Sequence, residues 1–111
     1  MIRAAYSLDD LTRALDGQDA VVCVVGVAGI PHQKVILDAA EAAGVRRFVL
    51  NDFGWGPDFR GLPEFDAIKA GRTESWDYAE TKAAANPGFT YTGVTTGNPI
   101  DWVCFRDTLL H

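Results

Sequence analysis

The hydrophobic and polar positions along the chain fall into segments typical of helices and segments typical of strands. Ser7 precedes apolar residues that recur on one helical face up to Gly17, which predicts a helix over residues 7–17. Residues 19–26 form an unbroken apolar run rich in valine. Such a run predicts a strand that is buried on both faces, as in a parallel sheet.

A second helix and a second strand follow. Residues 26–29 are predicted to form a turn, because the segment begins and ends with a glycine. Pro31 stands where a helix can begin. The apolar face of that helix continues up to Gly44. Residues 45–50 are then predicted to form the next strand.

The third unit begins with a long irregular segment. Residues 51–64 are rich in glycine, proline and aromatic residues, which predicts a loop of the kind that is often functional. A helix is predicted from about residue 65 to residue 85, and residues 89–94 are predicted to form the last strand. Alternating strands and helices favour right-handed βαβ crossovers and therefore an α/β fold with an open parallel sheet.

Composition limits the classes of protein that fit. The 111 residues suffice for a single domain over residues 1–111, and the net charge of -5, without a block of basic residues, argues against a nucleic-acid partner. The apolar runs are too short to cross a membrane, so we expect a soluble, cytoplasmic protein. Cys23 and Cys104 have no metal or redox spacing, and no metal site is predicted.

In open parallel sheets, ligands bind beyond the carboxyl ends of the strands, which points to the turn after residue 25 and to the segment after residue 50. One interpretation makes Gly26 the first glycine of a phosphate-binding fingerprint. His32 then stands where the third glycine belongs, and Arg46 and Arg47 stand near the position of the ribose-binding acid. Arginine suits a 2′-phosphate, so this alternative remains open.

Several segments together resemble the NmrA-like and isoflavone-reductase-like group of atypical short-chain dehydrogenases, particularly its fungal members. These are residues 11–15 with 17–22, residues 33–48, Asn-Asp-Phe-Gly at 51–54 in place of the usual Ser-Glu-Phe-Gly, and residues 86–92 with Asp101-Trp102. The resemblance covers roughly residues 5–102 in order. Each segment is weak alone, and the ordered set is more specific.

The resemblance implies a Rossmann-like sheet that lacks its first βαβ unit. Members of the family begin with a strand, a Gly-x-x-Gly-x-x-Gly turn, a helix and a second strand, whereas this chain resembles them from about the third strand onward. They also continue into a substrate-binding portion after the segment that resembles Trp102. The implied cofactor is NADP or NAD, and we expect its binding by this chain alone to be weak or absent, because the glycine turn supplies the main pyrophosphate contacts.

Two groups of cofactor-contacting residues follow from the resemblance. Val25, Gly26 and Val27 occupy the turn that contacts the cofactor in the family. The alternative is that Gly26 serves only a tight turn. Residues 51–53 (Asn51, Asp52 and Phe53) would line the nicotinamide side of the cleft, although loop stability explains them equally well.

A catalytic position is also implied. Reductases of this family use a lysine on the helix after the long loop as a general acid, and the equivalent position, counted back from Asp77-Tyr78, is Arg72. Arginine stays protonated near neutral pH, so it can hold an oxyanion but is a poor proton donor. Lys69 lies one helical turn earlier and could serve instead; a solvated helix face is the alternative for both residues.

Three functional hypotheses result. The first is an NAD(P)-binding oxidoreductase domain that reduces a small aromatic or polyketide-type substrate by hydride transfer. The second is a non-catalytic regulatory or interaction module, motivated by Arg72 at the lysine position. The third is a shortened paralogue with different chemistry, in which copies of the chain associate as a homo-oligomer that covers an exposed sheet edge.

Overall fold

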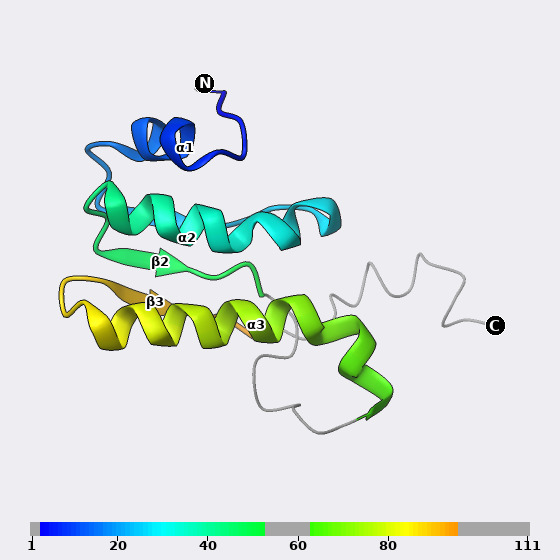
Figure 1. The fold of residues 1–111 in the computed structure, drawn as a ribbon. Coiled ribbons are helices and arrows are strands. Elements are labelled where there is room, and N and C mark those ends of the chain that lie inside the picture. The colour runs from blue at the N-terminus through cyan, green and yellow to red at the C-terminus, as the bar shows by residue number, and fades with distance from the viewer. Residues whose placement is uncertain (1–2, 53–62, 96–111) are drawn as a thin grey trace.

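A computed structural model describes residues 3–52 and 63–95, apart from the side chains of Val27, Arg72 and residues 63–70. The elements are, in order, α1 (Leu8–Leu15), β1 (Ala20–Val22), the 3-10 helix η1 (Val27–His32), α2 (Gln33–Ala42), β2 (Arg47–Val49), α3 (Pro63–Ala85) and β3 (Thr90–Thr92). The three strands are parallel and lie in the order β1-β2-β3 (Figure 1). The predicted α/β fold with an open parallel sheet is confirmed.

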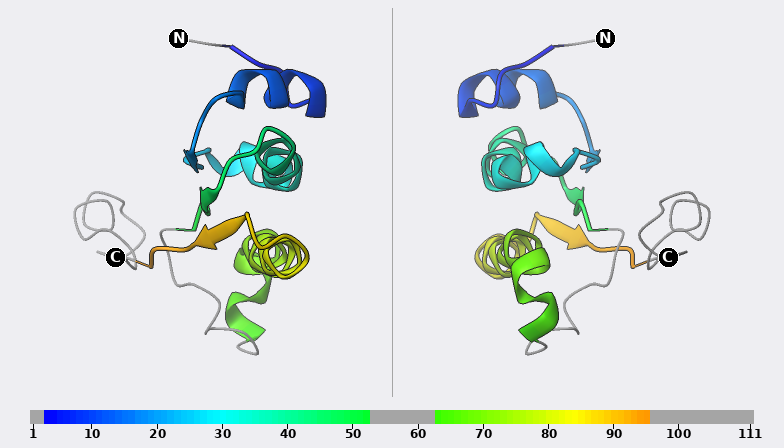
Figure 2. Two further views of the ribbon diagram at one scale, coloured as in Figure 1. Left: turned by 90° about the vertical axis from the view of Figure 1, so that its left-hand side faces the viewer. Right: turned by 90° about the vertical axis from the view of Figure 1, so that its right-hand side faces the viewer.

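The helices cover one face of this sheet. Figure 2 shows α2 and α3 on the same side of the strands, and α1 packs mainly against α2. Val21, Phe48 and Tyr91 are paired in register across the three strands, and Phe48 is fully buried. The core lies between this face and the helices and consists of Cys23, Ile36, Leu37, Ala40, Val45, Phe48, Leu50, Ala79 and Phe89.

The expectation that the first strand is buried on both faces is wrong for the part of the chain that the structure describes. Burial alternates along it: Cys23 is buried, whereas Val22 and Val24 are 60% and 73% exposed. Successive side chains of a strand point to opposite faces of the sheet, and no described element covers the face opposite the helices. The strand itself is also shorter than residues 19–26, because the register with β2 includes only Ala20–Val22.

Cys23 is a packing residue of the core. Cys23 belongs to the core, where desolvation raises the pKa of its thiol to about 11. The side chain therefore stays protonated near neutral pH and packs as a small hydrophobic group.

The helix boundaries follow the predicted signals, with two differences. Ser7 Oγ accepts a hydrogen bond from Asp10 N at 3.3 Å, which confirms the predicted cap of α1. Gly17 and Gly44, which follow α1 and α2, have φ values of 76° and 80°, a region that favours glycine. Pro31 lies inside η1, so α2 starts only after the 3-10 turn, and α3 begins at residue 63 rather than at about 65.

An ionic network joins α2 to α3. Tyr78 Oη donates to Asp38 Oδ1 at 2.6 Å, and Lys82 Nζ lies 2.7 Å from the same oxygen and 3.4 Å from Glu41 Oε1. The Lys82 side chain is only 13% exposed. Burial by itself lowers the pKa of Lys82, but the hydrogen bond and charge of Asp38 and the charge of Glu41 outweigh burial and raise this pKa above 10.5. The hydrogen bond to Asp38, with burial, raises the pKa of Tyr78 above 10.0.

This network predicts a loss of stability at high pH. Both groups keep their protons to higher pH in the folded state than in the unfolded state, so their contribution is full below about pH 10 and is lost as the pH rises through the raised pKa values. We expect Tyr78→Phe to lower the free energy of unfolding by about 1 kcal/mol near neutral pH, and to reduce its fall at high pH. Urea unfolding from about pH 7 to about pH 11 measures both effects, and an unchanged pH dependence in the variant contradicts the prediction.

Candidate functional site

The carboxyl ends of the three strands meet at one edge of the sheet. Figure 1 shows β2 pointing toward the same side of the molecule as the N-terminal half of α3. Residues within four positions of the strand ends there include Val25, Gly26, Asn51, Asp52 and Gly93, and we call this set the carboxyl edge. In open parallel sheets this edge is where ligands bind, so the sequence-predicted positions gather at the expected place.

Asn51 joins two of the strand ends. Its Nδ2 donates to the carbonyl oxygen of Val25 at 2.9 Å, and its backbone N–H donates to Gln33 Oε1 at 2.7 Å. Asn51 is 7% exposed and Gln33 is 1% exposed. The structure therefore brings two predicted cofactor-contacting residues, Val25 and Asn51, into direct contact. The Asn51 side chain is engaged within the protein and holds the end of β1 to the end of β2.

Asp52 is held by a residue of α3. It is 5% exposed, and its Oδ2 accepts a hydrogen bond from Trp76 Nε1 at 2.8 Å. The Trp76 ring also meets the ring of Tyr91 edge-on, with the centroids 6.1 Å apart. The Asp52 carboxylate thus connects the end of β2 to α3.

Gly26 has space beside it that the described residues do not fill. Its backbone angles, φ -67° and ψ 176°, are extended values that any residue adopts, and a Cβ placed on it would meet no atom within 4 Å. Gly29 N donates to the Gly26 carbonyl at 2.8 Å, so Gly26 does begin a turn, but its backbone angles do not require glycine. Gly29 differs, because a Cβ there would lie 2.7 Å from Val25 Cβ and 3.2 Å from Tyr6 Oη. Gly29 is needed for packing, whereas Gly26 faces open space at the carboxyl edge.

The two predicted catalytic positions lie on α3, in its N-terminal half. A Cβ on Gly71 would lie 3.2 Å from Ile30 Cγ2, so the helix backbone next to Arg72 packs closely against η1, which follows β1. The side chains of Lys69 and Arg72, and the whole of Phe53, lie outside the described residues. The roles of these three residues remain predictions, as does the contact of the Val27 side chain.

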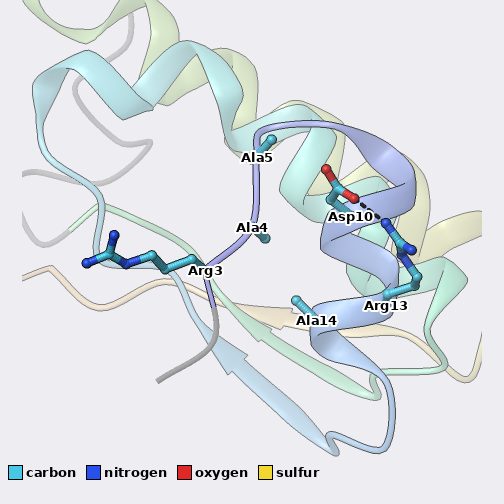
Figure 3. Close-up of a pocket in the computed structure, with 6 residues that line it drawn as sticks. All are labelled: Arg3, Ala4, Ala5, Asp10, Arg13 and Ala14. Carbon is cyan, nitrogen blue, oxygen red and sulfur yellow. Dashed lines mark hydrogen bonds and ion pairs between the residues drawn. The ribbon is translucent and has the colours of Figure 1, made fainter.

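A separate hollow of about 300 Å³ lies beside α1 and carries none of the predicted residues. It is lined by Arg3, Ala4, Ala5, Asp10, Arg13 and Ala14 (Figure 3). Arg13 is paired with Asp10, and Figure 3 shows the side chain of Arg3 extending away from Arg13. The two guanidinium groups do not converge, so this hollow does not form an anion site.

Two further classes of feature are absent from the described part of the chain. Residues 3–52 and 63–95 contain no group of three or more His, Cys, Asp or Glu side chains that could hold a metal ion. None of the helices within these ranges has the length and apolar character needed to cross a membrane.

Sequence reasoning predicted neither the hydrogen bond of Gln33 nor that of Trp76. A signal for Gln33 was present, because it lies at the start of the helical face formed by Ile36, Leu37 and Ala40, all of which are buried. A polar residue on an apolar face indicates a buried hydrogen bond. For Trp76 the sequence offered only an aromatic residue on a helix, and the contact with Asp52 depends on the tertiary fold.

Comparison with known proteins places these observations in a family. Residues 3–102 match a family model described as NAD(P)H-binding. The chain is 58% identical over 110 residues to oxidoreductase poxI of Penicillium oxalicum. The aligned residues make up 99% of this chain and 35% of that protein. It is 34% identical over 92 residues to oxidoreductase aprR of Aspergillus flavus. The aligned residues make up 79% of this chain and 29% of that protein. No solved structure matches the chain.

The chain therefore spans about a third of the length of the curated relatives that it matches. The match with oxidoreductases extends over both strand ends that Asn51 joins, since the 58% identity covers 110 of the 111 residues.

The hydrogen bond at Gln33 predicts a specific loss of stability. Gln33→Met keeps the size of the side chain but leaves the buried N–H of Asn51 without its acceptor, so we expect the free energy of unfolding to fall by about 2 kcal/mol. Gln18→Met, at an exposed position, is the matched control and should change stability by less than about 0.5 kcal/mol. Urea unfolding of both variants measures the difference, and equal effects contradict the assignment.

Proposed function

This chain belongs to the NAD(P)H-binding family, and we propose that its carboxyl edge forms part of a binding site for a reduced nicotinamide dinucleotide. The observation that carries the proposal is Gly26. Neither its backbone angles nor its neighbours in the described chain require glycine there, and the space beside it is open at the edge where ligands bind in such sheets. A glycine in that position lets a ligand approach the backbone closely.

The contacts to the cofactor fall to the backbone of Gly26 and Val27. The Asn51 amide is occupied by the Val25 carbonyl, and the Asp52 carboxylate by the indole N–H of Trp76. Both side chains are more than nine-tenths buried. In this proposal Asn51 and Asp52 fix the shape of the edge, and the backbone that they hold meets the dinucleotide.

We propose NmrA-like or isoflavone-reductase-like chemistry for the whole protein, on a small aromatic or polyketide-type substrate. When bound, a reduced nicotinamide would supply a hydride to one carbon of a substrate double bond, and negative charge would develop on the other atom of that bond, an oxygen or a carbon. The Lys69 ammonium donates the proton that this atom takes up, and water restores the lysine. The Arg72 guanidinium, which stays protonated, holds the developing negative charge.

Binding by this chain alone is expected to be weak. The described sheet runs in the order β1-β2-β3, with α2 and α3 on one side, so it contains no reversal of strand order of the kind at which dinucleotides bind. The segment after β1 is a 3-10 helix that contains Pro31, which has no N–H to donate to a phosphate. Calorimetry with NADPH that returned a micromolar or tighter dissociation constant would contradict this expectation.

The Gly26 assignment is tested by a pair of alanine substitutions. Gly26→Ala should leave stability unchanged or raise it by up to about 1 kcal/mol, because its backbone angles suit alanine. It should weaken NADPH binding, seen as smaller NMR shifts at the amides of Val27 and Asn51 during titration. Gly29→Ala is the matched control and should lower stability by about 1–3 kcal/mol, because its Cβ has no room.

The NADPH titrations distinguish the presence of a cofactor site at Gly26 from its absence. Saturable NADPH shifts at the carboxyl edge that weaken in Gly26→Ala support the proposal. Absence of saturable shifts in the natural protein, or equal NADPH affinity with and without the substitution at Gly26, overturns it.

A regulatory module is the second candidate, and Arg72 at the position of the implied lysine favours it. Lys69→Ala and Arg72→Ala distinguish the two in the natural protein. If it is a reductase, removal of the proton donor should lower kcat by about 10²–10⁴ with the affinity for NADPH unchanged. If it is a module that binds cofactor without turnover, NADPH oxidation in the presence of aromatic ketones is absent from the unaltered protein and from both variants.

A further inference from the structure

We propose that Trp76 is a positioning residue for the carboxyl edge, because its indole bridges the end of β2 to the end of β3. The bridge consists of Trp76, Asp52 and Gly93. Its importance for cofactor binding rests on the function proposed above, whereas its effect on the shape of the edge does not. Three observations carry the inference.

The first observation is the polar end of the bridge. The indole Nε1 of Trp76 donates to Asp52 Oδ2 at 2.8 Å, and Asp52 is 5% exposed. A hydrogen bond to a charged, buried acceptor is stronger than one between neutral groups. The donor comes from the middle of α3, so the helix fixes the chain at the point where it leaves β2.

The second observation is the apolar end. A Cβ built on Gly93 would overlap the six-membered ring of Trp76, so the indole occupies the place where a side chain of residue 93 would lie. The Tyr91 ring meets the indole edge-on at an interplanar angle of 83°. The indole is therefore held against the backbone that leaves β3, and its position leaves residue 93 no alternative to glycine.

The third observation is the place of the bridge along the strands. The last backbone hydrogen bond between these two strands in the described chain runs from Leu50 N to Thr92 O, at 2.9 Å. Asp52 and Gly93 lie just beyond it, where the ladder has ended. Trp76 thus connects the two strand ends at the point where the backbone no longer does.

Different residues fix the two sides of β2. Asn51 holds the end of β1, through the Val25 carbonyl, and Asp52 holds the end of β3, through Trp76. Loss of the Trp76 bridge should therefore loosen the β2–β3 side of the edge and leave the contact between Asn51 and Val25 in place. This pattern distinguishes positioning from general packing.

The test compares two unrelated ways of breaking the bridge. Trp76→Phe keeps an aromatic ring but removes the indole N–H, and Gly93→Ala pushes the ring away from the backbone. We expect both to speed amide hydrogen exchange at Asp52 and Gly93 by about tenfold or more relative to the core amides of β2. Tyr78→Phe is the matched control on the same helix, because it removes a hydrogen bond to Asp38 away from the edge.

Hydrogen exchange tests the inference without NADPH, and the NADPH titration tests the proposed function. Local acceleration at the edge in both bridge variants, but not in Tyr78→Phe, supports the inference whether or not NADPH binds. A uniform change in exchange across the chain, or acceleration in Tyr78→Phe of the same pattern, means that Trp76 has a merely structural role and overturns it. In an NADPH titration of the natural protein, a response that weakens in Trp76→Phe further supports the inference, whereas no response before the substitution overturns only the proposed function.

Discussion

The hydrogen bonds of Asn51 are the interactions on which the arrangement of the site depends. A parallel sheet leaves the backbone groups beyond its last ladder bond in need of partners, and at this edge Asn51 and Asp52 are buried. One amide side chain satisfies the Val25 carbonyl, and the backbone N–H of the same residue is satisfied by Gln33. Because β1, β2 and α2 share these contacts, the open backbone at Gly26 has a fixed position relative to the second strand.

The sequence predicted the fold more fully than the site. Local signals located the elements: the Ser7 cap, the glycines after α1 and α2, and the apolar runs are properties of short segments. Burial of the first strand was misjudged, since an apolar run reports which residues can be buried and not whether a second layer covers them. The partners of Asn51 and Asp52 were missed for a related reason, because residues 18 and 24 positions away become neighbours only in the folded chain.

Membership in the NAD(P)H-binding family and the geometry of Gly26 are two separate kinds of support for the proposed cofactor site. The family match concerns residues 3–102 as an ordered sequence, whereas the open space beside Gly26 is a local property of one backbone position. The relatives named as oxidoreductases are about three times as long as this chain. In the proposed function, the carboxyl edge contributes one side of a site, and the catalytic chemistry belongs to the whole protein.

The overlap between Gly93 and the Trp76 ring also has an evolutionary consequence. Any side chain at residue 93 requires a smaller residue at position 76, and a smaller residue at position 76 leaves a void that a side chain at residue 93 can fill. Neither change is readily tolerated first, so the two positions are epistatic. Homologous chains that lack the tryptophan should also have lost the glycine, and the pair should change together along a lineage rather than one at a time.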